Sequence, residues 1–525
     1  MSLPLRLLFL KVLLMGFLFL PKPSVLAQPM KLGVRTEMES SPFSDRHWLQ
    51  PLPDSSLLLV TTRSGSVTKK DHFLVSKLNH QLQPVWQQRF EQQPLTKLVG
   101  VSSDSQLFYL LFSISGTPSL LLYQISSSTG QAWLTRHEQT AGNVTITGMS
   151  VAAGQLLICA QQQRTGTTLL LALDPAQQQL SLLPAMYHSK EQLTDVRTDH
   201  ALRLTDLVAT ETNSLQSRFK INQISPRGDL KESLVVPAQL NSVFQQARIT
   251  TGITPSKQII GTYGDRGSSF TKGIFSSGLA GNATFYELGQ LQHIFEYEHT
   301  PKLQRLKRRY NRQKAKGKDF SLRQQVYLHQ ATAHPAGFSV VAEVYKTIYS
   351  KVPFEPGPAY TQVANSSVTV GSKQQGFFQF RSEHAPTTTM LQGKRIYVSY
   401  RFQAALILVF DQGGNLIEEG SIALQHHKTT VSPTVTSAVN PQGELALAYV
   451  KDGSLHYSLF RNSSWRLQPP VALQQDGYEG KPILKEPDGV LPWYNQNLLA
   501  YGYRRLPTKE GKSKSVLFLQ RILFQ

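Results

Sequence analysis

The sequence contains one cysteine, Cys159, and this excludes an intramolecular disulfide. Cys159 lies in an apolar run at 156–160 (LLICA), where we expect a small buried side chain rather than a nucleophile. Charged residues make up only 17% of the chain, and Gln, Ser and Thr fill polar positions instead. Stability therefore has to come from packing and strand pairing, as in an extracytoplasmic β protein.

Motifs that carry known catalytic chemistry are also missing. The chain has no HExxH, CxxC, Walker loop, G-x-S-x-G or calcium-loop spacing. Acidic residues, which glycoside hydrolysis needs in pairs, are few. The sequence therefore predicts no metal, no cofactor and no defined catalytic set, and it favours a function other than catalysis.

Residues 1–27 have the pattern of a cleavable secretory signal peptide. Arg6 and Lys11 supply positive charge, residues 12–20 (VLLMGFLFL) form a short apolar run, and residues 25–27 (VLA) offer a cleavage site. The apolar run is shorter than the roughly 20 residues that span a bilayer. We therefore expect an exported protein that is periplasmic or extracellular after cleavage, and a retained membrane anchor is the alternative.

Basic residues outnumber acidic ones. The formal net charge is +20, and removal of residues 1–27, which contain three basic residues and no acidic one, lowers it to +17. Such an excess favours anionic polysaccharide, lipid headgroups or nucleic acid as partners. Because an exported protein rarely meets nucleic acid, we expect an envelope protein or an anionic glycan as the partner, with the membrane surface as a further candidate.

An apolar strand followed by a polar turn recurs along the chain. Three of these marker strands begin at residues 73, 120 and 169, which are 47 and 49 residues apart. Five more begin at residues 219, 273, 406, 455 and 516, and further apolar strands precede several of them, among them 107–112, 155–160 and 395–400. A period near 50 is typical of four-stranded blades, so residues 28–525 are predicted to form one all-β propeller of seven or eight blades. An open stack of sheets, or two sandwiches, is the alternative.

A first insertion, from Phe285 to about Leu322, interrupts the repeat and carries a helical pattern. Thr300 and Pro301 form a good helix start, and Gly317 would end the helix. Leu303, Leu306 and Tyr310 share one face of it. The basic residues expected to form a binding surface are Arg305, Lys307, Arg308, Arg309, Arg312 and Lys314. The helix either docks on anionic lipid or polysaccharide, or caps the propeller while its charges are solvated.

A second insertion covers about residues 350–394. It is rich in Pro, Gly, Ser, Thr and Gln, and this composition predicts an extended loop. Long loops in compact folds are often functional.

Several segments of the second half carry a family resemblance. They are residues 261–264 (GTYG), 273–275 (GIF), 326–329 (VYLH), 341–345 (VAEVY), 409–417 (VFDQGGNLI) and 498–503 (LLAYGY). Together with the basic helix, these segments resemble a group of uncharacterised exported proteins of the Bacteroidota. The resemblance implies a β-propeller-like body and an envelope or extracellular setting, and it implies no activity and no catalytic residues.

One candidate site remains for an enzymatic alternative. Glu343 lies within an apolar strand, and buried carboxylates often have a perturbed pKa and a function. Propellers can hold active sites at the mouth of the central channel, so a polysaccharide hydrolase or lyase would need Glu343, Tyr263, His329 and Arg401 to converge there. Otherwise Glu343 faces solvent or pairs with a nearby arginine.

Overall fold

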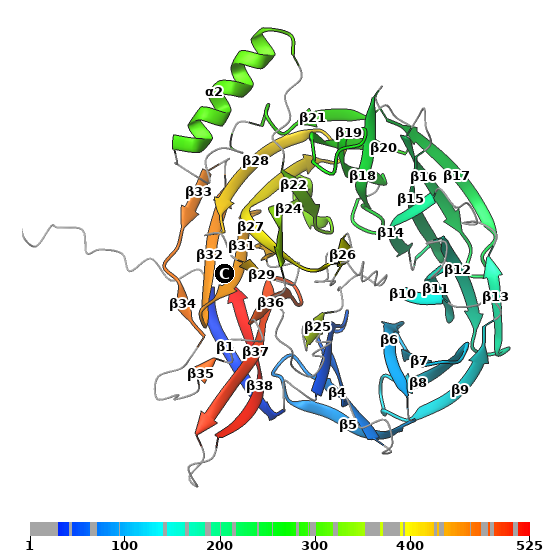
Figure 1. Ribbon diagram of the computed structural model, residues 1–525. Coiled ribbons are helices and arrows are strands. Elements are labelled where there is room, and N and C mark those ends of the chain that lie inside the picture. The colour runs from blue at the N-terminus through cyan, green and yellow to red at the C-terminus, as the bar shows by residue number, and fades with distance from the viewer. Residues whose placement is uncertain are drawn as a thin grey trace, which may run out of the picture.

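The computed structural model places the strands of this protein in a ring of eight sheets (Figure 1). It describes residues 30–525 except 41–44, 64–70, 94, 140–143, 163–166, 184–190, 200, 213–216, 239–240, 255, 280–282, 292, 294–300, 319–323, 352–367, 371–388, 392–393, 425–427, 430–434, 462–463, 474–480, 483–487 and 508–512. Each sheet is one blade whose successive strands run antiparallel, apart from β25, which is added in parallel to the sheet of blade one, and the first strand of each blade lies nearest the middle of the ring.

The first four blades follow one another without interruption. Blade one consists of β2 (Asp45–Pro51), β3 (Leu57–Arg63), β4 (Asp71–Leu78) and β5 (Pro84–Gln92). Blade two consists of β6 (Thr96–Ser103), β7 (Leu107–Ile114), β8 (Ser119–Ser126) and β9 (Ala132–Glu138). Blade three consists of β10 (Val144–Ala152), β11 (Gln155–Gln162), β12 (Thr168–Asp174) and β13 (Gln179–Leu183). Blade four consists of β14 (Glu191–Asp199), β15 (Leu204–Thr212), β16 (Ser217–Ile224) and β17 (Leu230–Pro237).

The last four blades include the insertions and the ring closure. Blade five consists of β18 (Ser242–Ile249), β19 (Gln258–Asp265), β20 (Gly273–Gly278) and β21 (Thr284–Glu287). Blade six consists of β22 (Gln325–Leu328), β24 (Gly337–Lys351), β27 (Lys394–Asp411) and β28 (Leu416–Ala423), with the short β23 (Thr332–His334), β26 (Thr389–Leu391) and β29 (Lys428–Thr429). Blade seven consists of β30 (Val435–Val439), β31 (Leu445–Lys451), β32 (Ser454–Arg461) and β33 (Ser464–Leu467), with β34 (Val471–Ala472). Blade eight consists of β36 (Gly489–Pro492), β37 (Asn497–Pro507), β38 (Ser513–Phe524) and β1 (Met30–Glu39), with β35 (Lys481–Pro482).

The prediction of an all-β propeller is confirmed, and the number of blades is eight. Each of the eight marker strands of the sequence lies in the third strand of its blade, namely β4, β8, β12, β16, β20, β27, β32 and β38. One expectation is wrong. Residues 395–400 do not form a separate strand, because they continue into the marker as part of β27, and the second strand of blade six is β24 instead.

Apolar side chains cover both faces of each blade. Several third strands therefore read as nearly continuous apolar runs, such as LLLY in β8 and LILVF in β27, whereas β16 (SRFKINQI) alternates apolar and polar residues over most of its length. Eight clusters of buried side chains result, one between each pair of neighbouring blades, including a cluster between blades eight and one. A blade cannot bury its two faces alone, so each depends on both neighbours.

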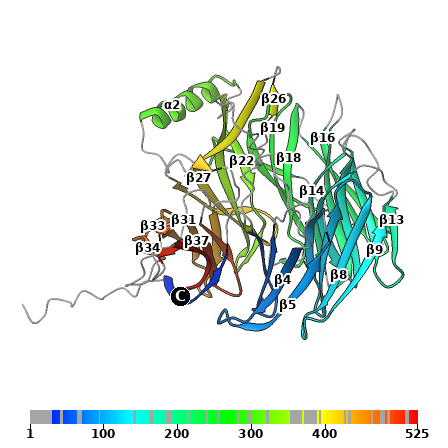
Figure 2. The ribbon, with the colours of Figure 1, turned by 60° about the horizontal axis from the view of Figure 1, so that its bottom comes forward.

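The two insertions leave the ring from the same end. α2 (Pro301–Ala315) lies between the outer strand of blade five and the inner strand of blade six, and the second insertion joins the second and third strands of that blade. In an antiparallel blade both connections emerge at one end, and Figure 2 shows α2 and β26 together there. Because β21 occupies Thr284–Glu287, Phe285 belongs to blade five and not to the helical insertion.

The second insertion is described only in part. Within it, β25 (Val368–Val370) pairs in parallel with β2 of blade one, with Val368 opposite His47. Figure 1 shows β25 inside the ring. A segment inserted into blade six therefore adds a strand to the inner edge of blade one, whereas residues 352–367, 371–388 and 392–393 lie outside the described residues.

The ring closes within blade eight, where the two ends of the described chain pair. β1 forms the outer strand of this blade and runs antiparallel to β38, from Met30 opposite Phe524 to Glu39 opposite Val516. The blue and red strands of Figure 1 lie side by side at this point. The first strand of the body therefore completes a sheet whose other strands come from the end of the chain.

Next to this closure, two arginines from the strands on either side of β38 stack on one aromatic ring, that of Phe518. The guanidinium of Arg35 lies 4.3 Å from the centre of the Phe518 ring, and that of Arg504 lies 4.4 Å from it. Arg504 is fully buried and makes two bonds to Asp488, of 2.7 Å and 2.8 Å. Burial raises the pKa of Asp488, and the bonds from Arg504 act in the opposite direction.

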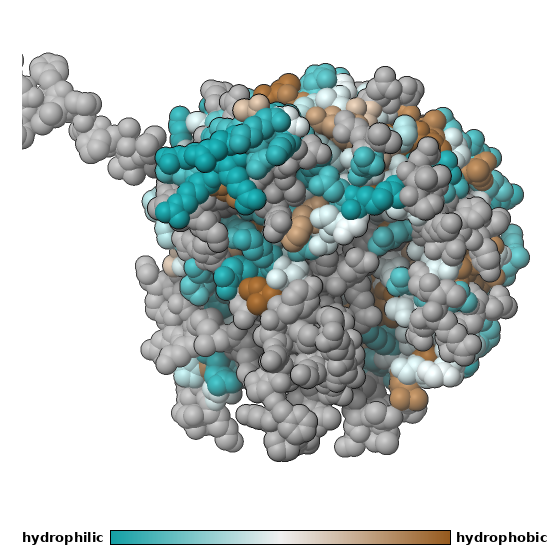
Figure 3. All heavy atoms as spheres, turned by 45° about the horizontal axis from the view of Figure 1, so that its top comes forward, coloured by the Kyte–Doolittle hydropathy of each residue, from teal (hydrophilic) through white to brown (hydrophobic). Residues whose placement is uncertain are grey.

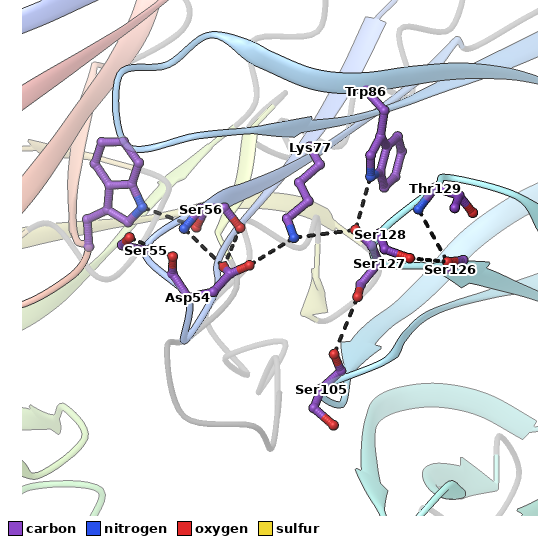
Figure 4. A network of polar contacts seen from close by, with 11 residues as sticks. Asp54, Ser55, Ser56, Lys77, Trp86, Ser105, Ser126, Ser127, Ser128 and Thr129 are labelled. Atoms are coloured by element: carbon purple, nitrogen blue, oxygen red, sulfur yellow. Dashed lines mark hydrogen bonds and ion pairs between the residues drawn. The ribbon is translucent and has the colours of Figure 1, made fainter.

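Polar contacts join turns of blades eight, one and two (Figure 4). Trp493 of blade eight donates its indole N–H to the carbonyl of Ser56 over 3.3 Å. Lys77 of blade one lies 2.8 Å from Asp54 and donates to the carbonyl of Ser127 in blade two over 3.3 Å. These contacts tie the turns of neighbouring blades to one another.

A buried histidine lies at the seam between blades eight and one. His47 Nε2 is 2.7 Å from Ser40 Oγ, and His47 Nδ1 is 3.0 Å from Thr61 Oγ1. Its ring centre is 5.9 Å from that of Tyr503 in blade eight. Burial lowers the pKa of His47 to about 4, although the nearby Asp45 carboxylate acts in the opposite direction.

Replacement of Arg504 with alanine should lower the free energy of unfolding by about 3 kcal/mol, because Asp488 would keep a buried charge without its partner. Urea denaturation of the two proteins measures this difference. Arg505→Ala is the matched control, since Arg505 is the next residue of β37 and is exposed, and it should change stability by less than about 0.5 kcal/mol. Equal losses in the two variants would contradict the role given to Arg504.

The His47 seam should make stability depend on pH. The folded protein keeps His47 neutral down to about pH 4, whereas the unfolded chain protonates it near its ordinary pKa of about 6.5. The contribution of buried, neutral His47 to the free energy of unfolding is therefore complete above about pH 6.5. About 2 kcal/mol of this contribution is lost between about pH 7 and about pH 5. Urea denaturation at the two pH values should show a smaller loss for His47→Gln than for the natural protein, and equal losses would refute this assignment.

Candidate functional site

α2 rests on the propeller through two side chains on one face. Leu306 packs against the apolar cluster between blades five and six. Tyr310 is buried, and its ring lies directly against Gly289, where a side chain would collide with it. The Tyr310 hydroxyl donates to Glu287 Oε2 over 3.2 Å. The expected shared face of the helix is therefore the one that contacts the blades, although the side chain of Leu303 lies outside the described part.

The helix ends next to Gly317, as the sequence predicts. Gly317 has a φ of 62°, which favours glycine, and Lys318 donates its backbone N–H to the carbonyl of Gln313 over 2.9 Å. Lys314 lies 3.6 Å from Glu287 and donates to the Tyr310 hydroxyl over 3.1 Å. This hydrogen bond raises the pKa of Lys314, so its charge is secure at neutral pH.

The remaining surface of α2 is basic and exposed. Its exposed basic side chains, here called the basic surface of α2, are Arg305, Lys307, Arg308, Arg309, Arg312, Lys314, Lys316 and Lys318. Residues 301–318 contain no acidic side chain. Figure 3 shows the helix as a continuous hydrophilic ridge. All six residues predicted as a binding surface therefore lie on the outside of the molecule.

The four residues proposed for the enzymatic alternative do not share one place. Glu343 and His329 are adjacent, with 3.1 Å between Glu343 Oε1 and His329 Nε2. Tyr263 is buried in the cluster between blades four and five, where its ring meets Phe285 edge-on at 5.1 Å. Burial raises the pKa of Tyr263. Arg401 is exposed on β27, opposite Lys346 and Lys428 in the ladder.

Glu343 joins blades six and seven. It is fully buried on β24, and its Oε1 accepts the backbone N–H of Val435 over 2.9 Å. Val435 is the first residue of β30, the inner strand of blade seven. The carboxylate therefore holds the neighbouring inner strand while it contacts His329, whose ring lies 5.3 Å from that of Tyr327.

Further buried charges lie on the inner strands of blades four and five. Asp195 Oδ2 accepts the backbone N–H of Ile249 over 3.0 Å and lies 3.8 Å from Arg197 Nε. Arg248 donates to the carbonyls of Thr194, over 2.8 Å, and Ala247, over 3.0 Å. The bonds from Ile249 to Asp195 and from Arg248 to Thr194 tie the inner strand of blade five to that of blade four.

Tyr327 connects these charges with blade six. Its side chain hydrogen-bonds Arg248. Burial raises the pKa of Tyr327, while Arg248 acts in the opposite direction. Burial also lowers the pKa of Arg197, which Asp195 opposes. Buried acidic and basic groups therefore extend from blade four to blade six, and the two arginines among them, Arg197 and Arg248, are close enough for their charges to repel.

The sequence interpretation missed Asp195, Arg197, Arg248 and Tyr327. A signal exists in the inner strands, because the ladder of each of blades two to five has a bulge, at Val99, Thr147, Thr194 and Gln245. Arg197 and Arg248 are both the third residue after their bulge, so they occupy equivalent positions on neighbouring strands. Because the partner strand defines these bulges, the equivalence of the two arginines is visible in the ladders and not in the sequence alone.

Two features relevant to function can be stated for the described residues alone. No group of three His, Cys, Asp or Glu side chains there could hold a metal ion. Within the same residues, no helix has the length and apolar character to cross a membrane.

Comparison with known proteins finds likeness in fold only. No family model matches the chain, and no curated protein matches its sequence. Similar solved structures include the polysaccharide lyase Uly1 (10% identity, TM-score 0.39, 94% of this chain and 100% of that one). Prolyl oligopeptidase B from Galerina marginata is also similar (8% identity, TM-score 0.37, 93% of this chain), and this chain spans 55% of its length. The Dos1 propeller matches at 10% identity and TM-score 0.27, over 50% of this chain and 86% of that one. These scores carry no argument about chemistry.

Glu343→Ala should lower the free energy of unfolding by about 3 kcal/mol, since it leaves the buried Val435 N–H without an acceptor and opens a cavity. Glu343→Gln keeps an acceptor oxygen and should cost about 1 kcal/mol. Urea denaturation measures both, with Glu232→Ala on the exposed side of β17 as control. If the glutamine variant were as unstable as the alanine variant, the charge of Glu343 and not its acceptor oxygen would be the stabilising feature.

Proposed function

We propose that this protein is an exported, non-catalytic propeller that binds an anionic glycan through the basic surface of α2. The observation that carries this proposal is the position of the helix. Leu306 and Tyr310 contact the propeller, and the basic side chains of residues 305–318 are exposed, with Lys314 also in contact with Glu287 of blade five. A polyanion can therefore reach these charges without any rearrangement of the scaffold.

The electrostatics favour a polymer over a small ion. A single exposed charge contributes little in water, because solvent and salt screen it. Several basic residues on one helix act together when one polyanion contacts all of them and releases its condensed counterions. The concentration of positive charge on α2 is suited to such a partner.

An exported location fits this partner. Residues 1–27 have the pattern of a cleavable signal peptide, and the remaining chain has a formal net charge of +17. Anionic polysaccharides are a main source of negative charge outside the cytoplasm. The propeller would act as a rigid mount for the binding helix.

The membrane-surface alternative is less well supported. A helix that lies in a bilayer interface inserts an apolar face between the headgroups. The apolar residues Leu306 and Tyr310 already contact the propeller, and residues 304–318 contain no Trp or Phe. These observations favour a soluble polymer over a lipid surface.

The enzymatic alternative gains little from the positions of its residues. It needs Glu343, Tyr263, His329 and Arg401 in one place. Of these four residues, Glu343 and His329 are adjacent, and the other two lie elsewhere. Glu343 is fully buried and holds a backbone N–H of the next blade. Its contacts support a role in packing between blades.

The proposal predicts salt-sensitive binding to heparin. The variant Arg305→Gln, Arg308→Gln, Arg312→Gln, Lys316→Gln should bind heparin about 100-fold more weakly at low salt, because four charges are lost. The slope of log affinity against log salt concentration should become shallower. Isothermal titration calorimetry at several salt concentrations measures both quantities on the mature protein.

A control variant loses the same four positive charges as the α2 variant but leaves the residues of α2 unchanged. It carries four substitutions at exposed positions of other elements, namely Arg89→Gln, Arg227→Gln, Lys231→Gln and Arg466→Gln. This variant should retain most of the heparin affinity. Equal losses in the two variants would show that net charge and not α2 attracts the polymer, and binding to phosphatidylglycerol vesicles but not to heparin would favour the membrane surface instead.

A further inference from the structure

The exposed charges of α2 are sorted by residue type. A helix advances by 100° per residue, so residues three and four apart lie along one line. Arg305, Arg308 and Arg312 follow this spacing and all are exposed. We call these three residues the arginine row. They lie on the side of the helix opposite Leu306 and Tyr310, and therefore point farthest from the propeller.

Lysines occupy a different part of the same surface. Lys307, Lys314 and Lys318 lie along the flank next to Tyr310, and Lys314 is held there by Tyr310 and Glu287. Lys316 extends the arginine row toward the end of the helix. The positions nearest to an approaching ligand are therefore mainly guanidinium groups, with ammonium groups to one side.

Guanidinium and ammonium groups bind anions differently. A guanidinium offers two parallel N–H donors to two oxygens of one anion, and it is more weakly hydrated than an ammonium. A sulfate ester carries one charge spread over three terminal oxygens, so it presents such an oxygen pair from several directions and gives up its hydration readily. A carboxylate has one oxygen pair in one plane and holds its water more tightly.

We propose that the arginine row recognises the sulfate esters of a sulfated polysaccharide. This inference rests on the proposed function and specifies its ligand. The row from Arg305 to Arg312 covers about 10 Å along the helix axis, comparable with one disaccharide of an extended chain. Successive sulfate esters of one polymer can thus meet successive arginines, and Lys316 continues the contact.

The test compares two polymers that share a backbone and differ in the anion. Dextran sulfate and carboxymethyl dextran of equal charge density are titrated into the mature protein. The natural protein should bind dextran sulfate about tenfold more tightly than carboxymethyl dextran. The variant Arg305→Lys, Arg308→Lys, Arg312→Lys keeps every charge and a good helix former at each position, and it should bind the two polymers within about twofold of each other.

The control makes the same exchange elsewhere. Arg89→Lys, Arg227→Lys and Arg466→Lys alter three exposed arginines outside α2 and should leave the preference unchanged. Equal affinity of the natural protein for the two polymers, or an unchanged preference in the α2 variant, would overturn the inference while the proposed function stands. Binding of neither polymer would overturn the proposed function itself. Circular dichroism of each variant confirms that the fold is retained.

Discussion

The pairing of β1 with β38 is the contact on which the rest of the structure depends, because it joins the two ends of the described chain in one sheet. Without it, blade eight would lose its outer strand, and the apolar faces of blades eight and one would have no fixed partner. This contact also bears the largest loop-closure cost in the molecule. The buried Arg504–Asp488 pair lies on the side of blade eight that faces blade seven, and the hydrogen bond from Trp493 to Ser56 joins blade eight to blade one.

The closed ring accommodates charged side chains in two environments, buried between neighbouring blades and exposed on α2. Asp195 on the inner strand of blade four and Glu343 on the second strand of blade six are buried, and each accepts a backbone N–H of the next blade, which compensates its burial. On α2, the arginines of residues 304–318 are exposed to solvent, whereas Leu306 and Tyr310 pack against the propeller. Buried charges fix the blades relative to one another, whereas exposed charges are available to a partner.

The sequence predicted the third strand of every blade. Several of these strands lie between two apolar clusters and read as nearly continuous apolar runs, whereas β16 carries Arg218, Lys220 and Asn222. The sequence also predicted α2, whose cap, apolar spacing and final glycine are all local signals. It failed at β27, where 18 residues form one strand, and at Asp195 and Arg248, whose contacts come from other blades. Register and bulges depend on the partner strand and leave little trace in one segment.

The sequence by itself determined the repeat, the all-β class, the position of the helix and the surplus of basic residues on it, because each depends on residues close together in the chain. The tertiary structure decided the number of blades, since closure of the ring depends on how far each blade turns relative to the last. It also decided that Glu343 meets His329 and Val435 while Tyr263 and Arg401 lie elsewhere, and that Arg305, Arg308 and Arg312 face outward. Those outcomes depend on contacts between residues far apart in the chain, which no single segment specifies.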